Sequence, residues 1–223
     1  MSTLLLRFAA PLQAWGTESK YDIRKTDREP SKSGVIGFLA AALGRRRDAS
    51  VEDLNELRLG VRVDQEGEII QDFHMVHKDE KTSYLTRRYY LSDAIFVVGL
   101  ESQDEEVLKK LEKAIKKPVF PLFLGRRSCP PCGPILLGIR ECGLEDALDN
   151  EPWQVSKWRQ DERKGVNSLR KIIESKSSGI ARKDQAISFS PYHREYGYRG
   201  VEEAICYLQP QIKETEHDPM KGL

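Results

Sequence analysis

The chain contains 223 residues, of which 39% are hydrophobic, and 36 Lys and Arg side chains nearly balance 35 Asp and Glu, giving a formal net charge of +1. This composition excludes a disordered chain, and the length is enough for one domain with a small extension. The longest stretches without a charged residue, 33–44 and 128–139, are shorter than the roughly 18–20 residues that span a bilayer. Four cysteines make no disulfide framework and the N-terminus lacks the basic region of a signal peptide, so we expect a cytoplasmic protein without membrane contact.

The charges are unevenly distributed along the chain. Residues 1–50 carry nine basic and five acidic side chains, and residues 151–200 carry eleven and six. Two basic segments separated by acidic ones suit a protein that holds a polyanion on one face and other proteins elsewhere. A solvated surface of mixed charge would give the same counts.

The first third of the chain predicts a strand, a long loop and a helix. Apolar residues alternate over 4–8, and Pro11 ends this strand. The loop from 9 to 30 has no clear period, and loops of this length are commonly functional. A helix then begins at 31–34, carries an apolar stripe, and ends at Gly44.

The middle of the chain predicts a short helix at 52–57 and a strand at 59–64. Two further strands, 68–77 and 84–91, form a hairpin whose tip is the charged run 78–81.

The next segments complete a mixed fold. Residues 93–100 are a continuous apolar run, typical of a strand buried on both faces, and 104–116 form an amphipathic helix with Asp104 as N-cap. Residues 119–124 are predicted to return as a strand. The resulting order, β, α, β, hairpin, β, α, β, predicts an α+β protein with the split βαβ pattern of a ferredoxin-like (RRM-like) fold.

The C-terminal part has a weaker pattern. Residues 153–175 are predicted to be partly helical, and 186–190 and 204–208 to be short strands. We therefore divide the chain into a ferredoxin-like domain at 1–145, with the hairpin at about 72–90, and an extension at 146–223 that completes or flanks it.

Two segments favour phosphate binding. Free backbone N–H groups at the helix start Ser31–Gly34, together with Lys32, suit an anion, but the string is not a nucleotide-binding Walker A loop. In 125–128, Gly125 permits close approach of a ligand to the backbone, and two arginines follow. An ordinary helix cap and an ordinary basic loop are the alternatives.

The cysteines and histidines give no metal or cofactor prediction. Cys129 and Cys132 form a CxxC, but there is no second ligand pair for zinc, and the surrounding prolines exclude the helix of a redox motif. His74 and His77 in one strand point to opposite faces. Either could act as a general base, and the partners Tyr84, Lys78 and Lys81 would suit a metal-independent ribonuclease.

A further cluster surrounds His193. Three tyrosines and two arginines near it would suit stacking on exposed bases, although a tyrosine-rich interface with another protein fits equally well. They are Tyr192, Tyr196, Tyr198, Arg194 and Arg199.

Four blocks of this sequence together resemble one family. They are LLLRFAAPLQAWG at 4–16, PSKSGVIGFLAAALG at 30–44, YLSDAIFVVGL at 90–100 and FPLFLGRRSCPPCGPILLG at 120–138. In order and spacing they are similar to the CasD family, a ferredoxin-like subunit of the type I-E CRISPR surveillance complex Cascade, within the RAMP superfamily. Cys132 departs from the family pattern.

The resemblance implies a non-catalytic, RNA-binding subunit in antiviral and anti-plasmid defence. The family caps the 5′ handle of the CRISPR RNA (crRNA), its hairpin acts as a thumb against the adjacent backbone subunit, and its body helps to seat the large subunit, with target DNA near the protospacer-adjacent motif as a further candidate partner. A related type I-C subunit cleaves repeat RNA, and such an endoribonuclease activity is the alternative. The RNA-binding residues implied here are Gln13, Trp15, Arg24, Lys32, Ser33, His74, Arg87, Arg88, Gly125, Arg126, Arg127 and Ser128.

Overall fold

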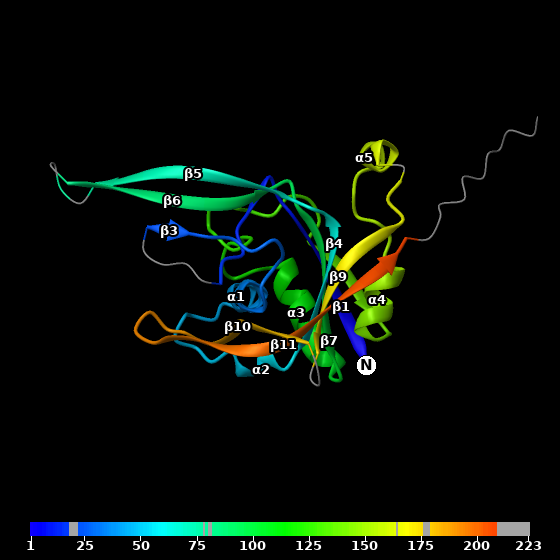
Figure 1. Cartoon of the computed structure of the whole chain (residues 1–223). Helices are drawn as coiled ribbons and strands as arrows, with labels where there is room; N and C mark the ends of the chain where they lie inside the picture. The colour runs from blue at the N-terminus through cyan, green and yellow to red at the C-terminus, as the bar shows by residue number, and fades with distance from the viewer. Residues whose placement is uncertain (18–21, 78, 80–81, 164, 176–178, 209–223) are drawn as a thin grey trace, which may run out of the picture.

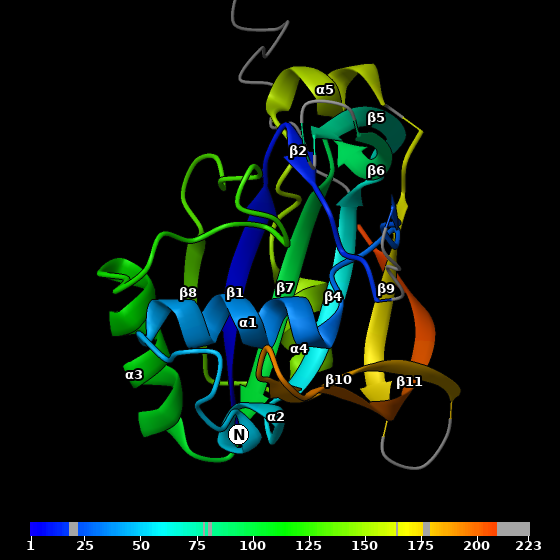
Figure 2. The same ribbon diagram turned by 90° about the vertical axis from the view of Figure 1, so that its left-hand side faces the viewer.

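The computed structural model describes residues 1–17, 22–77, 79, 82–163, 165–175 and 179–208. A seven-stranded sheet with the order β10-β11-β9-β4-β7-β1-β8 forms its centre, and every neighbouring pair is antiparallel (Figures 1 and 2). Its strands are β1 (Ser2–Ala9), β4 (Arg58–Gln65), β7 (Ile95–Ser102), β8 (Leu136–Arg140), β9 (Ser168–Ser175), β10 (Ile180–Phe189) and β11 (Arg194–Tyr207). The predicted α+β class is confirmed.

Helices cover both faces of the sheet. On one face lie α1 (Lys32–Ala42) and α3 (Glu105–Lys116), and on the other lies α4 (Leu144–Asn150), as Figure 2 shows. The side chain of Asp104 accepts a hydrogen bond from Glu106 N and caps α3 as predicted. A short α2 (Glu52–Asn55) follows α1, and no described helix combines the length and hydropathy needed to cross a bilayer.

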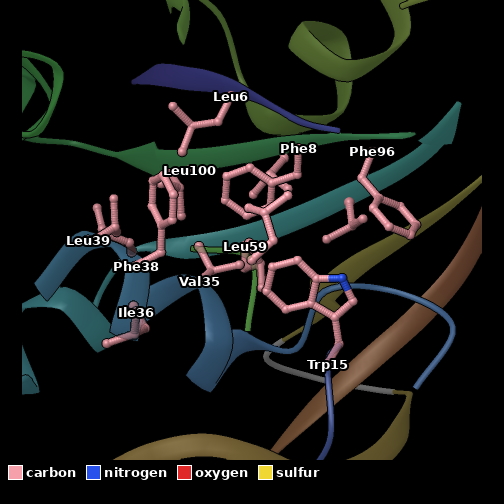
Figure 3. Packing of buried hydrophobic residues seen from close by; sticks show 14 of the residues in the cluster. Leu6, Phe8, Trp15, Val35, Ile36, Phe38, Leu39, Leu59, Phe96 and Leu100 are labelled. Atoms are coloured by element: carbon pink, nitrogen blue, oxygen red, sulfur yellow. The ribbon is translucent and has the colours of Figure 1, made fainter. Parts of the chain in front are cut away.

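The main face of the sheet carries an aromatic core. The ring of Phe8 in β1 stacks on Trp15, with 5.6 Å between centroids, and it also packs against Phe38 of α1 at 4.9 Å (Figure 3). This packing joins the first strand, the long loop and the first helix into one unit.

One predicted strand is wrong. Residues 119–124 form no strand, because Pro121 cannot donate to a sheet ladder and the amides of Val119 and Phe120 donate instead to the carbonyls of Ala42 and Ala41 at the end of α1. The next strand along the chain is β8, which begins at Leu136 and pairs with β1.

The predicted hairpin is present and extends well away from the main sheet (Figure 1). It consists of β5 (Glu68–His77) and β6 (Ser83–Ser92), paired without a register shift. β2 (Leu12–Gln13) pairs antiparallel with the base of β6, and β3 (Ile23–Arg24) pairs parallel with its middle. The long loop is therefore fastened along the hairpin.

The C-terminal part of the chain adds to the main sheet. β9 pairs with β4, and β10 and β11 form a curved hairpin that passes beside α1. The predicted strands at 186–190 and 204–208 fall largely within β10 and β11, and the short α5 (Lys157–Glu162) precedes β9. The predicted division near residue 145 stays a prediction.

Candidate nucleic-acid interface

The loop 125–128, which begins with Gly125, is fixed by a contact with the start of the chain. Gly125 has a φ of +86°, and a Cβ added to it would lie 1.6 Å from the carbonyl oxygen of Ala14. The amide of Ala14 in turn donates to the carbonyl oxygen of Leu124 at 3.2 Å. Only glycine fits this position. The space beside Gly125, which was predicted to admit a ligand, is occupied by the backbone of Ala14.

The side chain of Arg126, within this loop, is held by two contacts. Its guanidinium lies over the ring of Tyr90, 4.6 Å from the centroid, and its Nη2 donates to the carbonyl oxygen of Arg24 at 2.9 Å. Its Nη1 is buried without a hydrogen-bond partner among the described residues. The loop thus presents a cation whose orientation is set by the chain but whose hydrogen-bonding capacity is incompletely used.

Tyr90 lies at the centre of the predicted RNA-binding residues. Burial would raise the pKa of its hydroxyl, but hydrogen bonds with Ser128, Arg126 and Arg88 and the charge of Arg126 together lower it. Arg88 Nε is also buried without a partner in the described part of the chain. Three predicted residues, Arg88, Arg126 and Ser128, therefore converge on Tyr90, which sequence reasoning missed although it alternates with Arg88 along β6.

The remaining hairpin residues lie on two different faces. The register pairs Asp72 with Arg88, so that His74, two residues farther along β5, shares the face of Arg88, whereas Arg87 lies on the opposite face across from Phe73. His74 Nε2 is 2.5 Å from the carboxylate of Asp72. The hairpin therefore brings Arg88, but not Arg87, toward Tyr90.

Two predicted contact residues from the long loop are buried. Trp15 is 1% exposed and its Nε1 donates to Gln13 Oε1 at 3.1 Å, while Gln13 Nε2 donates to the carbonyl oxygen of Ala94 at 2.8 Å. These bonds satisfy the polar atoms of both side chains inside the core. The polar atoms of Gln13 and Trp15 are therefore bonded inside the core, and the RNA contact predicted for these two residues stays a prediction.

The predicted phosphate site at the start of α1 is already occupied by the chain itself. Asp184 of β10 accepts a hydrogen bond from the backbone N of Lys32 at 2.8 Å, and Lys32 Nζ lies 2.7 Å from Glu174 of β9. Burial lowers the pKa of Lys32, with Glu174 opposing this effect. Lys32 thus neutralises an internal carboxylate, and Ser33 is buried beside it.

The residues proposed for ribonuclease activity are only partly described. His77 lies on the opposite face of β5 from His74, as expected, and the register places Tyr84 on the same face as His74. Lys78 and Lys81 lie outside the described residues. Among the residues that the structure describes, no group of three or more His, Cys, Asp or Glu is placed to hold a metal.

A cleft of about 510 Å³ opens beside the loop. Its lining comes from α1 and the residues that follow it, from the segment 120–127, and from the β10–β11 hairpin. It contains the arginines 45–47, Arg127 and Arg194, and the predicted residues Trp15, Ser33 and Gly125 contribute to its wall. Sequence reasoning missed the run 45–47, although three consecutive arginines directly after a helix-ending glycine are a visible signal.

Comparison with known proteins gives consistent matches. The family model described as "CRISPR-associated protein (Cas_Cas5)" matches residues 3–202. The "CRISPR system Cascade subunit CasD" of Escherichia coli (strain K12) is 37% identical over 158 residues, which are 61% of this chain and 70% of that protein. A structure titled "Crystal structure of Cas protein" is 41% identical, with a TM-score of 0.74, and covers 92% of this chain and 95% of its own. A chain of a "CRISPR RNA-guided surveillance complex" is 28% identical, with a TM-score of 0.78, and the match covers 92% and 90%.

Proposed function

Because the chain belongs to this family of CRISPR-associated proteins, Cas_Cas5, we propose that it is a non-catalytic RNA-binding subunit of a Cascade surveillance complex that caps the 5′ handle of the crRNA. The observation that carries this proposal is the grouping of Arg88, Arg126 and Ser128 around Tyr90. Arg88 and Arg126 are partly exposed, and guanidinium groups that reach the surface are the groups that grip a nucleic-acid backbone. A short handle requires such a local grip, so a net charge of +1 is compatible with an RNA partner.

The projecting hairpin supports the proposed contact with the adjacent backbone subunit. On one of its faces Phe73 and Met75 are each 58% exposed, and Leu85 of the other strand lies across from Met75. Exposed apolar side chains in contiguous positions are typical of protein interfaces. The large subunit, and through it target DNA near the protospacer-adjacent motif, are the further partners that we propose for the body of the domain.

Handle binding is tested with the assembled complex, in which the crRNA 5′ end is probed by nuclease digestion. Arg126→Ala combined with Arg127→Ala should expose the handle and weaken assembly. The double change Arg159→Ala and Arg163→Ala removes the same charge from the region of α5 and serves as the matched control. Handle protection that is unchanged in the loop variant would defeat this assignment.

The non-catalytic role is tested by incubating the purified protein with its own repeat RNA in EDTA. We expect intact RNA. Specific cleavage that His74→Ala or Tyr84→Phe abolishes would instead establish the alternative, a metal-independent endoribonuclease.

A further inference from the structure

We propose that the cleft beside the loop 125–128 binds one unpaired nucleotide of the RNA, with its base against aromatic side chains and its phosphate on arginines. The inference rests on the proposed function, since the ligand is part of the same RNA. It adds a site that the residues around Tyr90 do not include.

The charge of the cleft favours a polyanion. Five arginines contribute to its lining, and none of the lining residues is Asp or Glu. Arg45 is paired with Asp53, but Arg46, Arg47, Arg127 and Arg194 form no ion pair with any described residue. Four unpaired cations around one hollow create a positive potential there, which favours the binding of an anionic ligand.

Aromatic side chains give the cleft surfaces for a flat ligand. Phe120 is 42% exposed, while Phe123, Phe189 and Tyr196 are half-buried. Because Gly37 has no side chain, the ring of Phe189 can lie close to α1. Phe189 Cζ is 3.7 Å from the position that a Cβ on Gly37 would take. Aromatic groups combined with arginines bind single-stranded nucleic acid by stacking, with little dependence on which base is present.

The position of the cleft selects RNA over a free small molecule. Gly125 and Arg127 line the cleft, whereas Arg126 between them faces Tyr90. The two sites therefore share one loop, and a strand that crosses this loop can place its backbone on Arg126 and the next base in the cleft. The volume of about 510 Å³ lies within the range of roughly 300–1,000 Å³ that is typical of small-ligand pockets, so the size admits one nucleotide and the shared loop is what favours RNA.

The β10–β11 hairpin is held in place independently of the ligand. Asp184 of β10 pairs with Arg199 of β11 at 2.7 Å while it caps α1, and Asn55 of α2 donates to the carbonyl oxygen of Ala186. These contacts fix the hairpin that carries Phe189, Arg194 and Tyr196, so the site is formed before the RNA binds. A preformed site binds with a smaller loss of conformational entropy.

The test uses the full chain and RNA of its own repeat-derived 5′ end, with 2-aminopurine substituted at one position at a time. With the unaltered chain, we expect binding to quench the fluorescence at one position of the RNA. In Tyr196→Ala this quenching should be lost, and the affinity for the RNA should fall about 5- to 100-fold. Tyr207→Ala, at the other end of β11 and 75% exposed, should change neither.

A second variant avoids the core. Arg46→Ala combined with Arg47→Ala changes only exposed side chains and should weaken RNA binding. It should also reduce the slope of log affinity against log salt by about 1 to 1.5, which a purely structural role would not do. Arg159→Ala with Arg163→Ala is the control of equal charge.

The outcomes separate the two proposals. If the unaltered chain binds the RNA and the changes at 46, 47 and 196 leave the affinity, salt slope and quenching unchanged, the cleft assignment is wrong and handle binding stands. If the unaltered chain does not bind the RNA, and the 5′ handle of the crRNA is not protected from nuclease in the assembled complex, the proposed function itself fails.

Discussion

The carboxylate of Asp184 accepts a hydrogen bond from the backbone nitrogen of Lys32 at 2.8 Å, although 152 residues separate them. The same carboxylate pairs with the guanidinium of Arg199 and is completely buried. A negative charge at a helix N-terminus is stabilised by the helix dipole and by free N–H groups. The anion that the start of α1 attracts is therefore a side chain of the protein, and this contact joins the C-terminal hairpin to the first helix.

Asp184→Ala should destabilise the chain strongly. The change leaves Arg199 buried without its partner and the amide of Lys32 without its acceptor, and breaking a buried pair in this way costs about 3–5 kcal/mol of unfolding free energy. Urea unfolding followed by circular dichroism measures this loss. Glu141→Ala, at an exposed position without a described side-chain partner, should stay within about 0.5 kcal/mol of the original chain. Equal stability of the two variants would show that the contact contributes nothing.

Gly125→Ala should disrupt the loop that carries Arg126. A methyl group would overlap the carbonyl oxygen of Ala14, and the φ of +86° is unfavourable for alanine, so the loop must move. We expect lower thermal stability together with weaker RNA binding. Gly165→Ala is the matched control because nothing described lies within 4 Å of its added Cβ. RNA binding that survives in Gly125→Ala would mean that the loop geometry does not matter for the interface.

The thiols should differ in reactivity. Burial raises the pKa of Cys129 and of Cys206, and because the thiolate is the reactive form, both should react slowly with a disulfide reagent near pH 8 and faster as the pH rises toward the raised values. Cys132 is exposed and should be labelled first. Mass spectrometry of timed samples gives the order, and rapid labelling of Cys129 in the native chain would contradict its buried position.

Much of the fold could be predicted because its signals are local. The apolar run of β7, the cap and stripe of α3 and the two arms of the hairpin are each encoded in fewer than fifteen consecutive residues, and all three are confirmed. The failure at 119–124 has a different cause. Its apolar residues resemble a strand, but Pro121 and the carbonyls of Ala41 and Ala42 at the end of α1 give this segment another role.

The candidate site was harder to predict because it is assembled from distant segments. The pattern around Lys32 predicts an anion site, but the sequence does not say that Asp184 and Glu174 fill the space near it. The cleft combines 45–47 with the loop near 125 and with Arg194. Periodicity identifies elements and their faces, whereas the pairing of faces depends on tertiary contacts that only the structure provides.

Trp15 is a structural residue, and its replacement separates a role in the core from one in RNA binding. Its ring stacks on Phe8 with an interplanar angle of 8°, and Gly34 leaves room for it, since a Cβ there would lie 2.8 Å from Trp15 Cε3. Trp15→Ala should therefore cost about 3–5 kcal/mol, which corresponds to a fall in melting temperature of roughly 6–20 °C for a chain of this size. Trp158→Ala is the control, because Trp158 is 60% exposed and its loss should change stability by about 0.5 kcal/mol or less.

The conservative variant Trp15→Phe decides between the two roles. It keeps an aromatic ring against Phe8 but removes the Nε1 donor to Gln13, so we expect a moderate loss of stability of about 1–3 kcal/mol and unchanged affinity for the RNA under conditions in which the chain is folded. A phenylalanine could also stack on a base, but it is smaller, so a tryptophan that contacts RNA would lose affinity in this variant while the melting temperature stayed constant. Thermal unfolding and RNA titration of the same preparation distinguish these results. Reduced affinity without reduced stability would place Trp15 in the interface, contrary to its 1% exposure.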